Sequence, residues 1–216
     1  MKLLVINKYL KNNFQNNDLK FYFVKRNDDF IELKALIEKD KPDEIISIDF
    51  GIPTTNEINN GSIIVAKDTI CINDKPVNWS IPREDLWNKT SENLNKSICD
   101  TLEKLTIEHY IGSGIELTNS SNIEKRIKAK EWINENIKGI YIDNYSSRLN
   151  EFLLENTNNC SILRIISSSF PINHNNNNFL GEIKRYFREL YFYKITAKKI
   201  QKDINKKKLI SEIFNI

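Results

Sequence analysis

Hydrophobic residues recur along the chain in two alternating patterns, short strand-like runs and longer helix-like stripes. The strand-like runs are rich in Ile, Val, Leu and Phe and are bounded by polar residues or glycine. We predict strands at 2–6, 20–25, 44–50, 62–67, 69–73, 107–113, 139–143 and 161–167. Single helices separate several of these strands, so right-handed crossovers and a mixed, largely parallel sheet are expected.

Apolar residues at spacings of three and four predict the helices between the strands. Helices are expected at 29–39, 91–105 and 122–137, in a segment ending near 156, and in a long segment near the carboxyl end. In that last helix one apolar stripe is expected to pack on the sheet; it comprises Tyr186, Leu190, Tyr193, Ala197, Ile200 and Ile204. Loops are expected at 79–89 and in the Asn-rich stretch 174–178.

These elements predict an α/β protein with a mixed, largely parallel central sheet covered by helices on both faces. The expected architecture is a three-layer α/β/α sandwich that binds ligands at the carboxyl ends of its strands. A length of 216 residues with 40% hydrophobic and 28% charged residues predicts a single globular domain over 1–216.

Composition also predicts where the protein works. No apolar run exceeds four residues, which is far short of the ~20 that span a bilayer, so we expect neither a membrane segment nor a signal peptide. The three cysteines are odd in number and share no Cys-x-x-Cys spacing. We therefore expect a cytoplasmic protein without a disulfide framework or a metal site.

The net charge of +3 is unevenly distributed, because residues 182–208 contain ten Lys or Arg and three Asp or Glu, a local charge of +7. The whole chain is too weakly basic to indicate a nucleic-acid partner. The basic helix could instead contact an acidic partner, although a solvated outer face with an apolar inner stripe is the favoured interpretation.

Few residues could carry chemistry. The two histidines, His109 and His174, leave little material for a catalytic triad or a histidine metal site, and neither a P-loop nor a Gly-x-Gly-x-x-Gly motif occurs. Polar residues at predicted strand ends remain, and Asp143 and Arg164 are the best pair among them. One helix separates their strands, which should place the strands side by side and allow a salt bridge.

The same region carries a family resemblance. A strand with Ser113-Gly114 is followed by the segments Ile-Asp-Asn-Tyr-Ser at 142–146 and Leu-Arg-Ile-Ile-Ser-Ser at 163–168. This order resembles the carboxyl-terminal half of the purine nucleoside phosphorylases and the methylthioadenosine/S-adenosylhomocysteine nucleosidases. Upstream, the glycine turn and valine-rich strand at 51–65 are similar to the same superfamily. The resemblance extends from about 45 to 208.

The resemblance implies a phosphorylase-like fold, a nucleoside-like small-molecule ligand and cleavage of an N-glycosidic bond. Phosphate would be a co-substrate in a phosphorylase and no other cofactor is implied, while a homodimer or higher homo-oligomer is expected. The motif positions would make Ser113, Leu117, Asn144 and Tyr145 substrate-binding residues and Ser168 the catalytic hydrogen-bond donor. Asp143 and Arg164 would form a structural pair at the site.

The departures from the family motifs leave two interpretations open. Tyr145 replaces the Glu that accepts hydrogen bonds from the ribose hydroxyls, and Ser168 replaces the Asp that protonates the base. Leu117 replaces the aromatic residue that stacks on the base, and residues 7–9 contain neither an acid nor a glycine. The chain is therefore either a divergent nucleosidase or phosphorylase, or a catalytically silent binding or regulatory protein.

Overall fold

The computed structural model describes residues 1–7, 9–10, 19–25, 28–73, 81–118, 129–157, 159–171, 179–205 and 212–213. Its strands are β1 (Lys2–Asn7), β2 (Leu19–Val24), β3 (Glu44–Pro53), β4 (Ile63–Asn73), β5 (Asn88–Lys89), β6 (His109–Thr118), β7 (Gly139–Asp143) and β8 (Cys160–Ile166). Its helical segments are α1 (Ile31–Asp40), η3 (Glu84–Leu86), α2 (Glu92–Lys104), η4 (Ile133–Ile137), α4 (Ser146–Asn156), α5 (Phe179–Tyr191), η5 (Phe192–Thr196) and α6 (Ala197–Asn205).

The strands form one sheet of mixed orientation in the order β2-β1-β3-β7-β6-β4-β5, and β8 pairs with both β3 and β4. The pairings β1–β2, β1–β3, β3–β8, β4–β6 and β6–β7 are parallel, whereas β3–β7, β4–β5 and β4–β8 are antiparallel. The mixed sheet expected from the sequence is therefore confirmed. The double pairing of β8 also closes β3, β7, β6, β4 and β8 into a ring of strands, which hydrophobic periodicity cannot reveal because it does not identify pairing partners.

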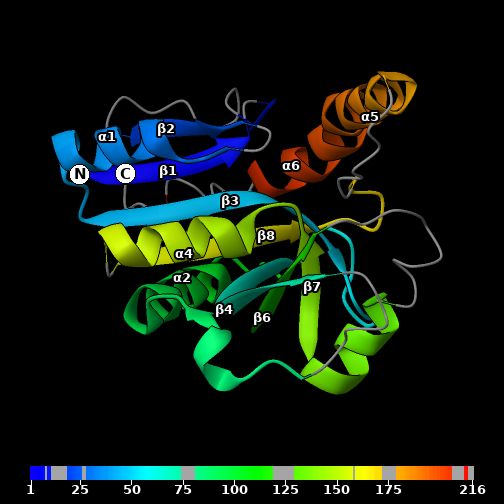
Figure 1. The fold of residues 1–216 in the computed structure, drawn as a ribbon, viewed down its shortest axis with the longest axis horizontal. Helices are drawn as coiled ribbons and strands as arrows, with labels where there is room; N and C mark the ends of the chain where they lie inside the picture. Colours follow the sequence, from blue (N-terminus) through cyan, green and yellow to red (C-terminus); the bar gives the residue numbers. More distant parts are fainter. Residues whose placement is uncertain are drawn as a thin grey trace.

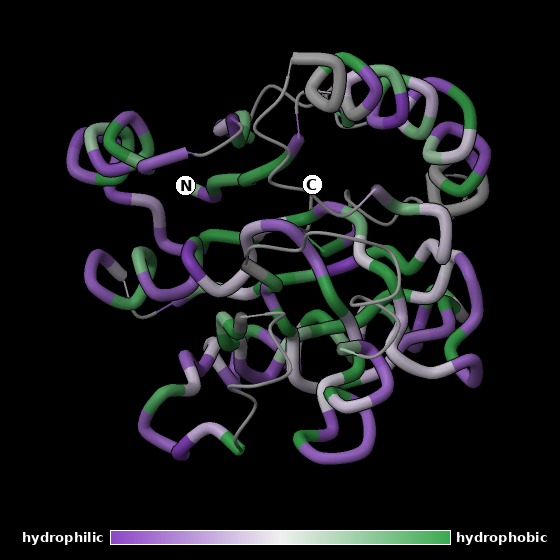
Figure 2. Tube along the Cα trace, turned by 45° about the vertical axis from the view of Figure 1, so that its right-hand side comes forward, coloured by the Kyte–Doolittle hydropathy of each residue, from purple (hydrophilic) through white to green (hydrophobic). Residues whose placement is uncertain are grey.

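Helices pack on both sides of the sheet (Figure 1). Leu3 and Val5 of β1 belong to a buried group that includes side chains of α1 and α4. Leu4 and Ile6 belong to another group, which includes side chains of α2, η5 and α6. Alternate residues of a strand point to opposite faces, so the apolar run of β1 serves both groups. Figure 2 accordingly shows mainly hydrophobic residues along the inner strands and mixed residues along the helices.

The start of α2 illustrates how local sequence sets the helix ends. Ser91 is its N-cap residue, and the Ser91 hydroxyl accepts a hydrogen bond from the backbone N–H of Leu94 at 3.4 Å. Leu94, Ile98 and Leu102 are buried, as their spacing of four predicts. At α1, Phe30 occupies the N-cap position in place of the expected Asp29, whose Oδ1 accepts from the N–H of Ile31 at 3.2 Å.

Three predicted elements differ in the structure. The strands expected at 62–67 and 69–73 form the single strand β4, whose register against β6 shifts between Ala66 and Asp68. The expected loop at 79–89 contains η3 and the short strand β5 in its described part, 81–89. Of the helix expected at 122–137, the described part ends in the π-helical turn η4. The Asn-rich stretch 174–178 lies outside the described residues.

Within the ring of strands, one glycine permits a close approach. A Cβ atom added at Gly114 of β6 would lie 2.1 Å from the hydroxyl oxygen of Tyr141 on β7. Tyr141 is fully buried, so its ring has no free space into which it could move.

None of the helices in the described ranges is long and apolar enough to cross a membrane.

Candidate functional site

The central feature of the site is a buried ion pair between β7 and β8. Arg164 Nε donates to Asp143 Oδ2 at 2.5 Å, and the side chains are 0% and 1% exposed. Arg164 Nη1 also donates to Ser47 Oγ at 3.2 Å and to its neighbour's carbonyl at 2.8 Å. The Nη2 atom of Arg164 has no hydrogen-bond partner among the described residues. The guanidinium carbon lies 4.9 Å from the centre of the Tyr145 ring.

Asp143 links this ion pair to the first turn of α4. Its Oδ1 atom accepts hydrogen bonds from the backbone N–H of Ser146 at 3.1 Å and from the Ser146 hydroxyl at 2.7 Å. Free N–H groups at a helix start are satisfied by a carboxylate in this way. Asp143 is therefore engaged on both oxygens, which leaves it poorly suited to contact a ligand.

A second buried carboxyl, Asp49, lies directly opposite Arg164 in the register of β3 and β8. It is 1% exposed, and its Oδ1 atom accepts from the backbone N–H of Phe50 at 2.8 Å and from the Tyr193 hydroxyl at 2.9 Å. Burial raises the pKa of Asp49 to about 6. The charge of Arg164, the hydrogen bond from the Phe50 N–H and the hydroxyls of Tyr193 and Tyr145 lower this pKa, but they do not cancel the effect of burial. Asp49 is thus the carboxyl of this cluster that can change protonation near neutral pH.

The side chain that reaches Asp49 comes from a π-helical turn. The turn η5 interrupts the helical segment between α5 and α6, and its consecutive residues Phe192 and Tyr193 are both buried, at 3% and 5% exposure. Tyr191 just before them is 64% exposed. A π turn inserts an extra residue into a helix and is frequent at functional sites. Here it brings two adjacent aromatic side chains onto the core side.

An aromatic layer adjoins the polar cluster. The Phe50 ring lies 6.3 Å from that of Phe170 and 5.0 Å from that of Phe192, between ring centres, and the latter two are 5.4 Å apart. Tyr193 stacks on Tyr9 at 5.2 Å. Of these aromatic residues, Tyr193 reaches the Asp49 carboxyl through its hydroxyl, and burial of that carboxyl is the main cause of its raised pKa.

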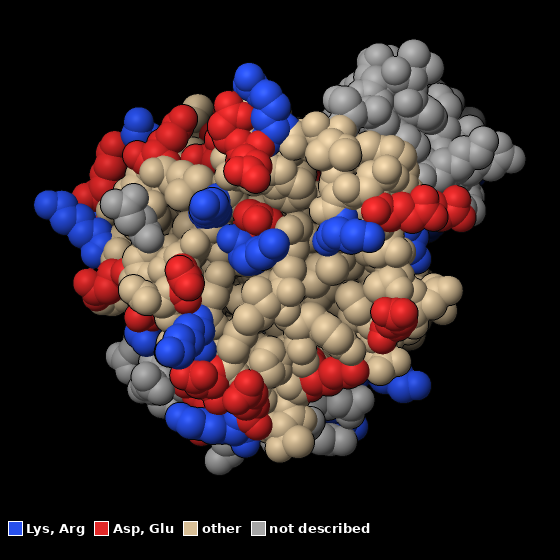
Figure 3. All heavy atoms as spheres, turned by 90° about the horizontal axis from the view of Figure 1, so that it is seen from below, with Lys and Arg blue, Asp and Glu red and all other residues tan. Residues whose placement is uncertain are grey.

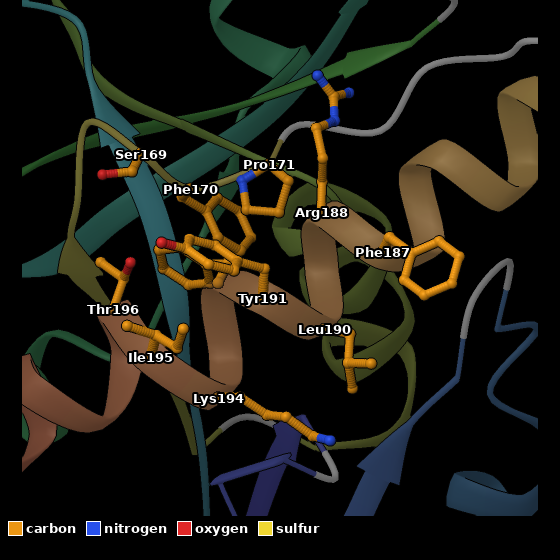
Figure 4. Close-up of a pocket in the computed structure, with 11 residues that line it drawn as sticks. Ser169, Phe170, Pro171, Phe187, Arg188, Leu190, Tyr191, Lys194, Ile195 and Thr196 are labelled. Carbon is orange, nitrogen blue, oxygen red and sulfur yellow. The ribbon is translucent and has the colours of Figure 1, made fainter.

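Phe170 and Phe192 of this aromatic layer also line a cavity of about 730 Å³ (Figure 4). Its walls are the turn after β8 and the outer side of α5 and η5. The lining residues are Ser169, Phe170, Pro171, Phe187, Arg188, Leu190, Tyr191, Phe192, Lys194, Ile195 and Thr196. The lining is thus largely apolar and aromatic, which is typical of small-molecule sites. Its charged members are the two cations, Arg188 and Lys194.

The structure places two of the sequence-predicted residues beside the cavity. Ser168 is exposed and precedes the lining residue Ser169; its N–H donates to Asn60 Oδ1 at 2.7 Å, and its hydroxyl accepts from Asn60 Nδ2 at 3.3 Å. Asn144 Nδ2 donates to the carbonyl of Pro171 at 3.1 Å, so Asn144 fixes part of the wall. Neither side chain is itself among the lining residues.

The other predicted substrate-binding residues lie farther inside the protein. Tyr145 is 7% exposed and belongs to the polar cluster with Arg164. Ser113 and Leu117 are 6% and 7% exposed on β6, and neither lines the cavity. The ligand-binding roles inferred from the resemblance remain predictions for all of these residues.

The carboxyl-terminal helix is where the sequence was least informative. Tyr193 and Ala197 are buried as expected, but Tyr186, from the same predicted stripe, is 53% exposed. The π turn changes the phase of the helix between these positions, so a single regular stripe cannot describe both halves. The regular stripe also omits Phe192, which is buried, for the same reason. The available sequence signal for its burial was that residues 192 and 193 are adjacent aromatic residues.

Glu116, the other carboxyl that could have replaced a family acid, is engaged elsewhere. It is 2% exposed and pairs with Arg148 of α4, accepting from both the backbone N–H and the Nε atom of that arginine. In the part of the chain that the structure describes, no group of three His, Cys, Asp or Glu side chains could hold a metal ion.

Neither a protein-family model nor a curated protein matches the sequence. Solved structures do match the fold. The futalosine hydrolase of Helicobacter pylori superposes with a TM-score of 0.67 at 11% identity, covering 100% of this chain and 97% of that one. The 5′-methylthioadenosine/S-adenosylhomocysteine nucleosidase of the same organism, solved with butyl-thio-DADMe-Immucillin-A, gives 0.66 at 11% identity, with coverage of 100% and 98%. A putative nucleosidase of the same kind from Francisella philomiragia gives 0.63 at 14%, with coverage of 95% and 97%.

The chain therefore shares its fold with these nucleosidases and with the futalosine hydrolase. The similarity covers nearly the whole length of both chains in each comparison. The resemblance inferred from the motifs around Asp143 and Arg164 is confirmed at the level of fold.

Proposed function

We propose that this chain binds a nucleoside- or base-like small molecule in the cavity between the turn after β8 and the α5–η5 helix. The observation that carries this proposal is the aromatic lining, in which Phe170, Tyr191 and Phe192 provide surfaces for a planar heterocycle. The position at the end of a sheet strand and the nucleosidase fold support it. Fold similarity alone would not suffice, because one fold serves many functions.

The geometry favours binding over efficient cleavage. Asp143 is held by Arg164 and Ser146, the Tyr145 ring lies beneath the Arg164 guanidinium, and Ser168 contacts Asn60. General acid and electrostatic contributions typically supply factors of ~10²–10⁴ each to such reactions. The catalytically silent alternative therefore explains the arrangement with fewer assumptions.

One observation favours cleavage as a second candidate. Asp49 is a buried carboxyl whose pKa of about 6 would let it donate a proton near neutral pH. Asp49 is 1% exposed and is not among the described residues that line the cavity, so this role requires a rearrangement that brings its carboxyl to the ligand. Hydrolysis by water or phosphorolysis by phosphate would then break the N-glycosidic bond.

Thermal unfolding with a panel of nucleosides and free bases tests the proposal. A ligand at 100 times its dissociation constant stabilises the folded state by about 2.7 kcal/mol, which raises the melting temperature by several degrees. We expect Tyr191→Ala to abolish that shift, because Tyr191 is an exposed cavity residue. Ile111→Ala removes a comparably exposed apolar side chain from β6 and serves as the matched control.

The same mixtures, analysed by chromatography with and without phosphate, report base release. We expect none above background. Release that disappears in both Asp49→Asn and Ser168→Ala would establish the enzyme instead, and its dependence on phosphate would separate phosphorolysis from hydrolysis. The absence of any thermal shift across the panel would contradict the binding proposal itself.

Several further expectations belong to this proposal. We infer a three-layer α/β/α arrangement in one domain spanning 1–216, a homodimer or higher homo-oligomer, and a cytoplasmic location. The packing of helices on both sides of the sheet supports the first. The others rest on the sequence composition and on the family resemblance.

A further inference from the structure

The walls of the cavity are positively charged as well as aromatic. Arg188 and Lys194 line it, and none of its lining residues in the described part of the chain is a carboxylate. Both side chains are exposed, and neither forms an ion pair with another described residue. Among the described lining residues, a positively charged group on a ligand would therefore meet two cations and no carboxylate.

The surrounding helix reinforces this charge. Across the described side chains of 183–202, the exposed charged residues are all cations: Lys184, Arg188, Lys194, Lys198, Lys199 and Lys202. The acid in that set, Glu189, is half-buried. On the face shown in Figure 3, by contrast, Lys and Arg are interspersed with Asp and Glu. Among the described side chains, the α5–η5–α6 helix is thus more strongly positive than the face shown in Figure 3.

A cleft with charge of one sign and apolar walls concentrates the electric field, because the walls screen charge less than water does. Phe170, Tyr191 and Ile195 form such walls beside Arg188 and Lys194. Figure 4 shows the two cations extending in opposite directions from the helix. They therefore act on a ligand as separate contacts rather than as one clamp.

We infer that the ligand of this cavity is anionic, a heterocyclic molecule carrying a phosphate or carboxylate group rather than a neutral nucleoside. This inference rests on the proposed use of the cavity as a ligand site. The aromatic walls would contact the heterocycle, while Arg188 or Lys194 would contact the anionic group. The anion could be part of the ligand or a separate inorganic phosphate ion, and both sources share the same chemistry.

Calorimetric titration of the full chain distinguishes these sources. The probes are adenosine, uridine, their 5′-monophosphates, inorganic phosphate alone, and each nucleoside together with inorganic phosphate. We expect a monophosphate to bind roughly tenfold more tightly than its nucleoside at low salt, and the difference to shrink as salt rises. If phosphate instead strengthens nucleoside binding by a similar factor while the monophosphate gains nothing, the anion is a separate ion.

Charge-removing variants locate the effect. Arg188→Gln or Lys194→Gln should reduce the preference for the anionic probe by about threefold to tenfold. Lys199→Gln removes an exposed cation of the same helix that does not line the cavity, and should leave the preference unchanged.

Equal affinity for a nucleoside and its monophosphate, without help from phosphate, would overturn this inference and leave the proposed function intact. An equal loss of the preference in Lys199→Gln would also overturn it, because the charge effect would then belong to the whole helix. If no probe binds, the inference and the proposed function fall together.

Discussion

Replacing Arg164 with methionine is expected to lower the free energy of unfolding by about 3–5 kcal/mol, the usual cost of removing one partner from a buried ion pair. Arg164 is fully buried and faces two carboxyls, Asp143 at 2.5 Å and Asp49 opposite it in the strand register. Without the guanidinium, Asp143 would remain a buried charge that only Ser146 stabilises. Urea unfolding followed by circular dichroism measures the loss.

Two variants separate a specific loss of the ion pair from a general sensitivity to mutation. Lys25→Met removes the cation of an exposed pair with Glu32, where both side chains are more than half exposed, and should cost far less stability than Arg164→Met. Arg164→Met combined with Asp143→Leu removes both buried charges and should cost clearly less than the two single variants added together. Simple additivity would show that the two residues do not interact.

Stability should fall as pH rises from about 4 to 6, and Asp49→Asn should remove that dependence. The pKa of Asp49 is about 6 in the folded protein, chiefly because of burial, and 3.8 is its ordinary value. Between these values the folded state keeps a proton that the unfolded state has lost, so raising the pH favours unfolding. The difference between the two pKa values corresponds to about 3 kcal/mol in the free energy of unfolding, and this stabilisation is lost above pH 6.

Unfolding free energies at several pH values from 4 to 8 test this prediction. Asp49→Asn should be more stable than the natural protein above pH 6, by up to about 3 kcal/mol, and the difference should shrink towards pH 4. Asp85→Asn alters a carboxyl that is 65% exposed and should give a small difference at every pH. A difference between Asp49→Asn and the natural protein that is constant across the range would show that Asp49 is ionised throughout.

The sequence identified the strands and most helices because their signals are local. The apolar runs of β1 and β8 and the apolar spacing of four in α2 each specify an element without reference to the rest of the chain. The Asp143–Arg164 ion pair was also predicted, but the expectation that their strands lie side by side is wrong: β7 and β8 each pair with β3 and not with each other. The family motifs around these residues correctly indicated the fold.

The arrangement of the site depended on tertiary contacts that no periodicity encodes. The closure of β3, β7, β6, β4 and β8 into a ring follows from the pairing of β8 with two strands, and the sequence of β8 does not specify its partners. The proton affinity of Asp49 depends on its burial and on the hydroxyl of Tyr193, which reaches it from η5, 144 residues farther along the chain.

The sequence by itself indicated most strands and helices and the basic character of the last helix, because composition and periodicity are properties of neighbouring residues. The fold was indicated by the resemblance of its motifs to a known family. Only the tertiary structure decided that Phe192 and Tyr193 both turn inward, that Ser168 lies beside the cavity and not in it, and that two cations line the aromatic walls. These features arise from a π turn and from contacts between distant segments. The free energies of these contacts depend on burial, which exists only in the folded chain.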